Sequence, residues 1–376
     1  MITKLTFSKD KYAASDEYAV ILDNSVKLTR MAMQKHFSKE PTANITTESD
    51  IRSDEYEKLN DIVKKGMIKY SAKISNLSDM YDISTRAGFK QAITGSTQFR
   101  EALFAIQIQT IDTVNSTSEV EQALLLAEVR NLAEGDSETF DIGSKSLFQV
   151  EQTGYSNNVS RLQYQFMAPT ILVPRPHEAS VGVDLFQLNA NGFDFGKQMA
   201  KIAISFRVAM YDDIIANIFT VANVSATPFY KATFAKTTYQ QLGNVVAGAN
   251  GSGVMAYGTN VAFGKMSDQI VSNFAFGTSA EYVKSGMVTD LYGIPSMILR
   301  QAVNPNDGTY GFKVPDDRII LTTPSTDKPV KIVIGGETYV TIDDGLNNSI
   351  NLKTFKYKQS WKAGIVTQSA YAIQQL

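Results

Sequence analysis

The chain of 376 residues contains no cysteine, only two histidines and a single tryptophan. Without cysteine it can form no disulfide, no thiolate metal site and no cysteine nucleophile. His36 lies at the end of a polar N-terminal segment, whereas His177 follows two prolines in a predicted loop. With two histidines in such different settings, a histidine-based triad or zinc site is not expected.

The chain has no large excess of positive or negative charge, because 36 basic and 38 acidic residues leave a formal net charge of −2. Neither a basic nucleic-acid-binding domain nor an acidic tail is indicated. No apolar run reaches the roughly 20 residues that span a bilayer, and the first residues lack the pattern of a signal peptide. We therefore expect a protein that is soluble when made and has no membrane partner.

Motifs for catalysis and cofactor binding are missing as well, since no HExxH or GxSxG occurs. Residues 258–266, GTNVAFGKM, place five residues between the glycines and a methionine after the lysine. A phosphate-binding loop needs four residues there, and Ser or Thr after the lysine. The acidic stretch 343–348 lacks the spacing and closing glutamate of an EF-hand, so a turn between strands explains it better.

Three further residues were weighed as functional candidates. Asp212 and Asp213 are expected on the solvent side of a long helix, where adjacent side chains do not face each other, so they make a poor acid/base pair. Trp361 falls within a predicted strand, where burial explains it better than ligand stacking. We predict that the chain is not an enzyme, and assign it no catalytic, cofactor-binding or metal-binding residue and no cofactor.

Helical periodicity dominates the first 115 residues. Apolar residues recur at helical spacing in residues 16–37, 49–77 and 96–113. In the second of these, the stripe consists of Leu59, Ile62, Val63, Met67 and Tyr70. The region reads as polar and helical, and is either an elaborated arm or a small added domain.

Residues 119–172 differ in character. The stretch 119–132 is predicted as a short amphipathic segment. Alternation of apolar and polar residues over 140–150 and again over 162–166 predicts two β-strands, with the turn-rich sequence TGYSNN between them. A two-stranded ribbon is marginal in water by itself. Because this hairpin has no obvious core of its own, we expect it to rest on something else.

The most regular stretch is 194–222. It contains no proline, and Asp194 is a plausible N-cap. About 28 residues at ~1.5 Å each give a rod of about 42 Å, well above the mean helix length. Its apolar stripe consists of Met199, Ile202, Ala203, Phe206, Met210, Ile214 and Ile218.

The remainder of the chain mixes helices and strands, so that the whole is predicted to be α+β. Helices are expected at 236–248 and 267–275. Strands are expected in YGIPSMIL, DRIILTTP, KPVKIVIGGETYVTI and WKAGIVTQSAYAI, which are rich in Val, Ile, Tyr and Thr. The sequence VAFGKM is predicted as a short strand or turn.

This order of elements resembles the major capsid protein of tailed bacteriophages, the Hong Kong 97-like fold. GDSETFDIGSKSLFQVEQTGYSNNVSRLQYQ looks like the extended hairpin of that family, the E-loop. FDFGKQMAKIAISFRVAMYDDIIANIF looks like its spine helix, with Arg207 and the two aspartates on the polar side. YGIPSMILRQAVNP and PDDRIILTTP look like axial-domain strands, and WKAGIVTQSAYAIQQL like the final strand. The resemblance spans residues 120–376 or so.

The resemblance implies an N-terminal arm, an E-loop, a spine helix, a peripheral domain and an axial domain. The corresponding ranges are 1–118 for the helical arm or added region, 119–134 for the start of the peripheral domain, 135–170 for the E-loop hairpin, 171–225 for the peripheral domain with the spine helix at 194–222, 226–345 for the axial domain, and 346–376 for the strands that return to the peripheral domain.

The implied function is structural: self-assembly, through hexamers and pentamers, into the icosahedral head shell that encloses the phage genome. The implied partners are portal, scaffolding or decoration proteins and packaged DNA in non-specific contact, in a virion assembled in the host cytoplasm. An arm and a ribbon that gain stability from neighbouring copies fit this function. An encapsulin-type nanocompartment shell, which would have the same fold, and a phage tail protein are the alternatives. Lys145 lies in the ribbon, but no acid or asparagine partner marks a cross-link, and none is predicted.

Overall fold

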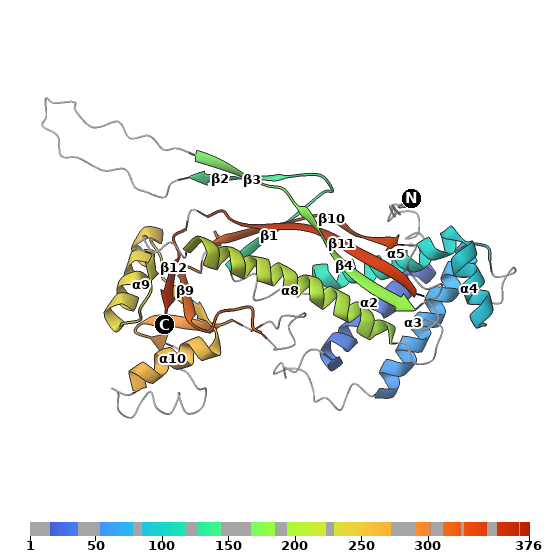
Figure 1. The fold of residues 1–376 in the computed structure, drawn as a ribbon, viewed down its shortest axis with the longest axis horizontal. Helices are drawn as coiled ribbons and strands as arrows, with labels where there is room; N and C mark the ends of the chain where they lie inside the picture. Colours follow the sequence, from blue (N-terminus) through green and yellow to red (C-terminus); the bar gives the residue numbers. More distant parts are fainter. Residues whose placement is uncertain are drawn as a thin grey trace, which may run out of the picture. The chain divides into compact units, whose positions relative to one another are not determined.

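The computed structural model describes residues 16–36, 53–77, 85–117, 126–143, 167–184, 194–222, 229–271, 290–299, 301, 311–324, 327–343, 352–367 and 369–376. The chain divides into two units (Figure 1). The first consists of Met1–Glu119, Arg175–Arg207 and Gly335–Ser360, and the second of Val120–Pro174, Val208–Ile334 and Trp361–Leu376. One long helix and two long strands continue from one unit into the other.

Helices and strands both occur throughout the described residues. The helices are α2 (Asp16–His36), α3 (Ser53–Ile74), α4 (Arg86–Gly95), α5 (Thr97–Thr117), α8 (Phe195–Ala222), α9 (Lys236–Asn250) and α10 (Asn260–Val271). The strands are β1 (Ala127–Leu132), β2 (Glu138–Gly143), β3 (Met167–Leu172), β4 (Arg175–Asp184), β5 (Tyr230–Lys231), β6 (Met255–Gly258), β7 (Asp290–Leu291), β8 (Ile294–Ile298), β9 (Arg318–Thr322), β10 (Val330–Asp343), β11 (Leu352–Ile365) and β12 (Ala372–Gln375). The predicted α+β class is confirmed.

In the first unit, α2, α3 and α5 pack against one another (Figure 1). The rings of Tyr18 and Tyr70 lie 5.5 Å apart between α2 and α3. Helix α5 is apolar almost all round, as expected of a buried helix; its buried side chains include Phe99, Leu103, Phe104, Ile106, Ile108, Ile111 and Val114. The region therefore has a core of its own. The predicted helical character is confirmed, and the predicted polar character is wrong for α5.

Two details of these helices also differ from the sequence pattern. Ile62, predicted on the buried stripe, is 58% exposed. Val63 and Met67 of that stripe are buried, and Tyr56, which the stripe did not include, is buried with them. Helix α4 was not predicted. Its N-cap is Thr85, whose hydroxyl accepts a hydrogen bond from the backbone N–H of Gly88 at 3.2 Å.

Helix α8 has the predicted bounds and is continuous over 28 residues. The predicted N-cap is confirmed, since the Asp194 carboxylate accepts a hydrogen bond from the backbone N–H of Lys197 at 2.9 Å. Another orphan donor of the first turn, the N–H of Phe195, is satisfied by the side-chain oxygen of Asn60 at 3.1 Å. All seven residues of the predicted stripe are buried, namely Met199, Ile202, Ala203, Phe206, Met210, Ile214 and Ile218.

The second unit contains a six-stranded sheet of order β5-β12-β9-β6-β8-β7. Strand β9 runs antiparallel to both β12 and β6, whereas β6 and β8 are parallel. Helices α9 and α10 contribute to its core, which includes Tyr239, Leu242, Val246, Phe263, Met266, Ile319 and Leu321. The short strand or turn predicted for VAFGKM is wrong, because these residues lie in α10. Its start is marked by the Thr259 hydroxyl, which accepts a hydrogen bond from the N–H of Ala262 at 3.1 Å.

The two long strands β10 and β11 pair with each other. In the first unit β11 also pairs with β4, and in the second unit β10 also pairs with β1. Neither flanking strand was predicted. The described part of the amphipathic stretch 119–132 is mostly the strand β1, because pairing with β10 decides its conformation more strongly than its own periodicity does.

Candidate functional site

The residues considered for catalysis are held in unrelated settings. The Nδ1 atom of His177 lies 2.9 Å from the carbonyl oxygen of Arg175, and His36 is the last residue of α2. Within the described ranges no group of His, Asp or Glu could hold a metal ion. The helices of those same ranges include none that is long and apolar enough to span a membrane.

Asp212 and Asp213 bind different partners in the second unit. The Asp212 carboxylate forms an ion pair with Lys313 at 2.6 Å. Asp213 accepts a hydrogen bond from the indole Nε1–H of Trp361 at 2.8 Å. The predicted burial of Trp361 is confirmed, since it is 1% exposed. The prediction that Asp213 lies on the solvent side is wrong, because a buried indole needs an acceptor and finds it there.

Arg207 was also expected on the polar side of the helix. In the first unit its Nη2 donates a hydrogen bond to the carbonyl oxygen of Val114 at 2.9 Å. Burial lowers the pKa of the guanidinium below its usual value. The side chain therefore fastens α8 to the end of α5, which sequence spacing cannot reveal.

Several predicted features lie outside the described residues. These are the ribbon tip TGYSNN, Lys145 and most of the acidic stretch 343–348. The second predicted ribbon strand, 162–166, lies there too.

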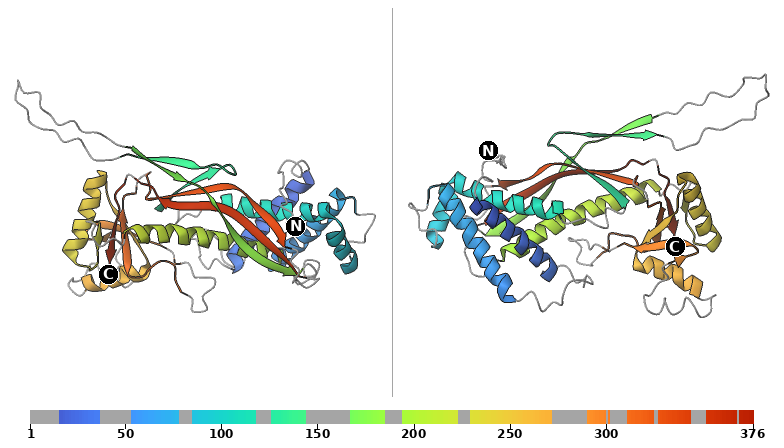
Figure 2. Two further views of the ribbon diagram at one scale, coloured as in Figure 1. Left: turned by 45° about the horizontal axis from the view of Figure 1, so that its top comes forward. Right: turned by 180° about the vertical axis from the view of Figure 1, so that it is seen from behind.

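The described part of the ribbon is its base, which consists of β2 and β3. The two strands pair antiparallel from Glu138 opposite Leu172 to Gly143 opposite Met167. They form a sheet of their own, which includes no other described strand (Figure 2). Residues 140–143 of the first predicted strand lie in β2, whereas β3 was not predicted as a strand. The pairing of 140–150 with 162–166 stays a prediction, because residues 144–166 lie outside the described ranges.

An apolar cluster anchors the ribbon base within the second unit. Phe140 and Leu172 are 6% and 7% exposed, and they pack with Val333 and Val366. Gly364 permits this approach, because a Cβ there would lie 2.9 Å from Cδ2 of Leu172. The sequence pattern indicated no core for the hairpin, so this cluster was missed. Its members come from four distant segments, and only the fold brings them together.

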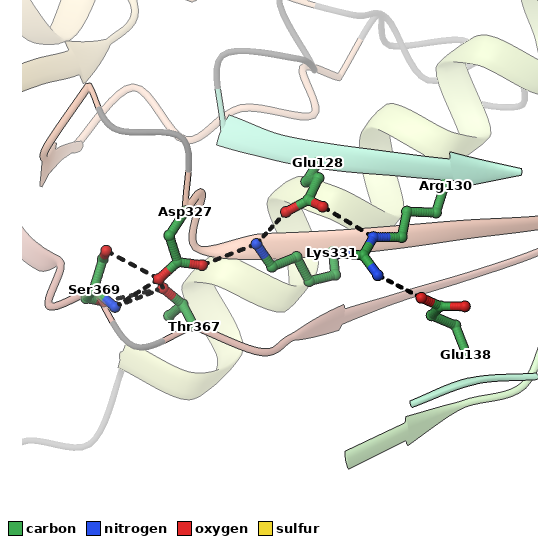
Figure 3. A network of polar contacts seen from close by, with 7 residues as sticks. All are labelled: Glu128, Arg130, Glu138, Asp327, Lys331, Thr367 and Ser369. Atoms are coloured by element: carbon green, nitrogen blue, oxygen red, sulfur yellow. Dashed lines mark hydrogen bonds and ion pairs between the residues drawn. The ribbon is translucent and has the colours of Figure 1, made fainter. Parts of the chain in front are cut away.

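A polar network, drawn in Figure 3, touches the same anchor through Arg130. The guanidinium of Arg130 on β1 lies 4.6 Å from the ring centroid of Phe140, a cation–π contact. It forms an ion pair with Glu138 on β2 and donates to Glu128 at 2.9 Å. These two carboxylates raise the pKa of Arg130, chiefly through the bond to Glu138. The first ribbon strand is thus held by a charged contact and an aromatic contact to one side chain.

The network continues through Lys331 on β10, whose side chain is only 6% exposed. Its ammonium binds Glu128 and, at 2.9 Å, Asp327 (Figure 3). Asp327 also accepts bonds from the backbone N–H and hydroxyl of Ser369, each at 3.1 Å, and from the Thr367 hydroxyl at 3.2 Å. Every charge in the network therefore has an opposite partner, as a nearly buried lysine requires.

The outer side of the ribbon base carries an exposed aliphatic side chain beside polar ones. Leu172, the last residue of β3, is buried, whereas Ile171 before it is 60% exposed and Val173 after the strand is 54% exposed. Alternation at period two sends Ile171 to the opposite face from Leu172, where Thr139 lies across from it. The arrangement offers a fixed strand pair with exposed aliphatic side chains, the kind of surface on which another chain can dock.

No family model and no curated protein matches the sequence. The fold is similar to solved phage-type capsid structures. The capsid of a native GTA particle matches with a TM-score of 0.45 and 13% identity, covering 68% of this chain and 89% of that chain. The mature capsid of bacteriophage PhiM1 matches with a TM-score of 0.44 and 9% identity, covering 68% and 86%. The capsid of cyanophage P-SCSP1u matches with a TM-score of 0.43 and 12% identity, covering 66% and 86%.

Proposed function

We propose that this chain is the major capsid protein of a tailed bacteriophage, a structural subunit whose copies assemble into the icosahedral head. The observation that carries the proposal is the two-faced ribbon base. One face is anchored in its own unit by Phe140 and Leu172, whereas the other presents Ile171 to solvent.

Such a ribbon is suited to lie on a neighbouring copy. Burying an aliphatic side chain of this size contributes about 1.5–3 kcal/mol, and a contact of this type is repeated by every subunit of a closed shell. The same proposal includes hexamers and pentamers, packaged DNA, and portal, scaffolding or decoration proteins as partners. It also includes the assignment of 135–170 as E-loop, 226–345 as axial domain and the virion as the location.

Electron microscopy of the purified full chain tests the proposal. Negatively stained samples should contain uniform closed cages tens of nanometres across, and sedimentation should show the same large species. A chain that stays a compact monomer at every concentration would overturn it. Cages that are purified with a protein cargo in place of DNA would favour the nanocompartment alternative.

A matched pair of variants tests the ribbon surface itself. Ile171→Asp should prevent or strongly weaken assembly while the free chain keeps its wild-type unfolding curve, because the side chain is already exposed there. Ile62→Asp on α3 makes the same chemical change at a position with nearly the same exposure, 58% against 60%. Cages with Ile171→Asp as abundant as with Ile62→Asp would contradict docking through this face.

A further inference from the structure

Five charged side chains link the ribbon base to a segment near the C-terminus without a gap. They follow one another as Asp327, Lys331, Glu128, Arg130 and Glu138, with acids and bases in alternation (Figure 3). At one end Asp327 binds Thr367 and Ser369, between β11 and β12. At the other end Glu138 is the first residue of β2, where the ribbon begins.

Lys331 is the least exposed member of this series. Its side chain is 6% exposed, against 27% for Glu138 and 42% for Arg130. A surface ion pair contributes little because water screens it, but a nearly buried ammonium must keep its partners or leave an uncompensated charge. Lys331 therefore constrains Glu128 and Asp327 more strongly than an exposed lysine would.

The charges around Lys331 are balanced. Burial by itself would raise the pKa of Glu128, but the hydrogen bonds and charges of Lys331 and Arg130 outweigh it and hold that pKa below its usual value. The other cation close by is Lys328, whose pKa is lowered, mainly by burial and also by Lys331, while Glu128 opposes the shift. Exchanging one charge in this set consequently affects its neighbours, a condition for coupling between the two ends.

We propose that Lys331 is a positioning residue for assembly, which fixes the direction of the ribbon base by linking Asp327, and through it Thr367 and Ser369, to Glu128 on β1 and so to β2. The inference rests on the proposed function, and it names the residue that positions the ribbon base for docking. A ribbon held in one direction loses less conformational freedom when it docks on a neighbour, so its contacts yield a tighter shell. Without the Lys331 charge the ribbon base samples more directions and assembly requires a higher concentration of subunits.

The first experiment compares Lys331→Met, Lys331→Arg and Lys362→Met, all in the full chain. Methionine keeps the length of the side chain without its charge, and arginine restores the charge. Lys362 is an exposed lysine of β11 and serves as the control. We expect Lys331→Met to raise the assembly threshold, measured by light scattering, about tenfold, as the loss of one well-formed ion pair would, with Lys331→Arg recovering most of it. A threshold within twofold of wild type for Lys331→Met, or an equal rise for Lys362→Met, would overturn the inference.

The second experiment separates positioning from simple support of the fold. Hydrogen–deuterium exchange of residues 138–143 is followed in the unassembled chain for Asp327→Asn, Glu138→Gln and the double variant. If the series of contacts transmits the constraint, Asp327→Asn accelerates exchange in β2, and this effect disappears when Glu138→Gln is already present. Strictly additive effects, or no change in β2 with Asp327→Asn, would show that the ends are not coupled.

The two proposals can fail separately. If the wild-type chain forms no cages, the proposed function fails, while the exchange cycle still measures coupling in the free chain. If cages form and the cycle is additive, the role of Lys331 fails and the shell function stands.

Discussion

Gly196 in the first turn of α8 lies where a methyl group has no room. A Cβ at this position would be 2.7 Å from Cγ of Leu28, 2.9 Å from the Tyr56 hydroxyl and 3.2 Å from the carbonyl oxygen of Leu28. Leu28 is 0% exposed and Tyr56 is 3% exposed, and one of the three obstacles is backbone. The substitution Gly196→Ala therefore forces α2, α3 or the start of α8 to shift.

Two opposing terms set the size of the effect. Alanine is favoured over glycine within a helix by about 1 kcal/mol, whereas overpacking a well-filled core costs about 1–3 kcal/mol. Because a fixed carbonyl is among the obstacles, the cost lies in the upper part of that range. We expect Gly196→Ala to lower the free energy of unfolding by about 1–2 kcal/mol.

Gly248→Ala in α9 is the matched control. A Cβ there would meet no heavy atom within 4 Å, so only the helix preference acts and the expected gain is about 0.5–1 kcal/mol. Urea unfolding of the unassembled chain, followed by circular dichroism, measures both variants. A Gly196→Ala protein as stable as wild type, or a change of the same sign in both variants, would refute the reasoning from the close approach.

Three further outcomes are expected. Phe140→Ala should cost about 3–5 kcal/mol, as large-to-small core substitutions do, and should raise the assembly threshold; normal assembly in scattering experiments would contradict the role of the anchor. Trp361→Phe removes the donor to Asp213 and should lower the unfolding free energy by about 1–3 kcal/mol, whereas an unchanged urea midpoint would show that the bond contributes nothing. The hydrogen bond from Lys358 lowers the pKa of Glu178 from its ordinary 4.5, so its contribution is complete above that value and is lost as the pH falls through the lowered pKa. Glu178→Gln should therefore flatten the acid limb of a stability–pH curve below pH 4.5, and an unaltered limb would argue against this ion pair.

Local pattern alone was enough for the elements whose signal repeats along one stretch of chain. Helix α8 and its cap at Asp194 follow from uninterrupted helical spacing and from the hydrogen-bonding ability of aspartate at a helix start. The β-rich character of the C-terminal part follows from Val-, Ile- and Thr-rich runs bounded by Gly and Pro. Helix α5 also follows from its helical spacing, but its burial on nearly every side does not, because a single apolar stripe predicts only one buried face.

Contacts between residues far apart in the sequence leave no periodic pattern along the chain. Lys331 and Glu128 are 203 positions apart, and nothing in the neighbourhood of either residue distinguishes it from the other charged side chains of the chain. The cluster of Phe140, Leu172, Val333 and Val366 is likewise assembled from three strands and the residue that follows β11. A sequence gives the chemistry of each side chain but not its distance to another, so the anchor was missed and only the hairpin was predicted.

The amino-acid sequence by itself determined the absence of thiol chemistry, the α+β class, the continuous α8 and the existence of a strand pair before it, because composition and periodicity are properties of short stretches. Only the tertiary structure decided that the ribbon base has an anchored face and an exposed face. It also decided that Asp213 accepts a hydrogen bond from Trp361, and that the missing side chain of Gly196 leaves room for Leu28 of α2 and Tyr56 of α3. These depend on which surfaces meet, and close packing of distant segments sets that choice.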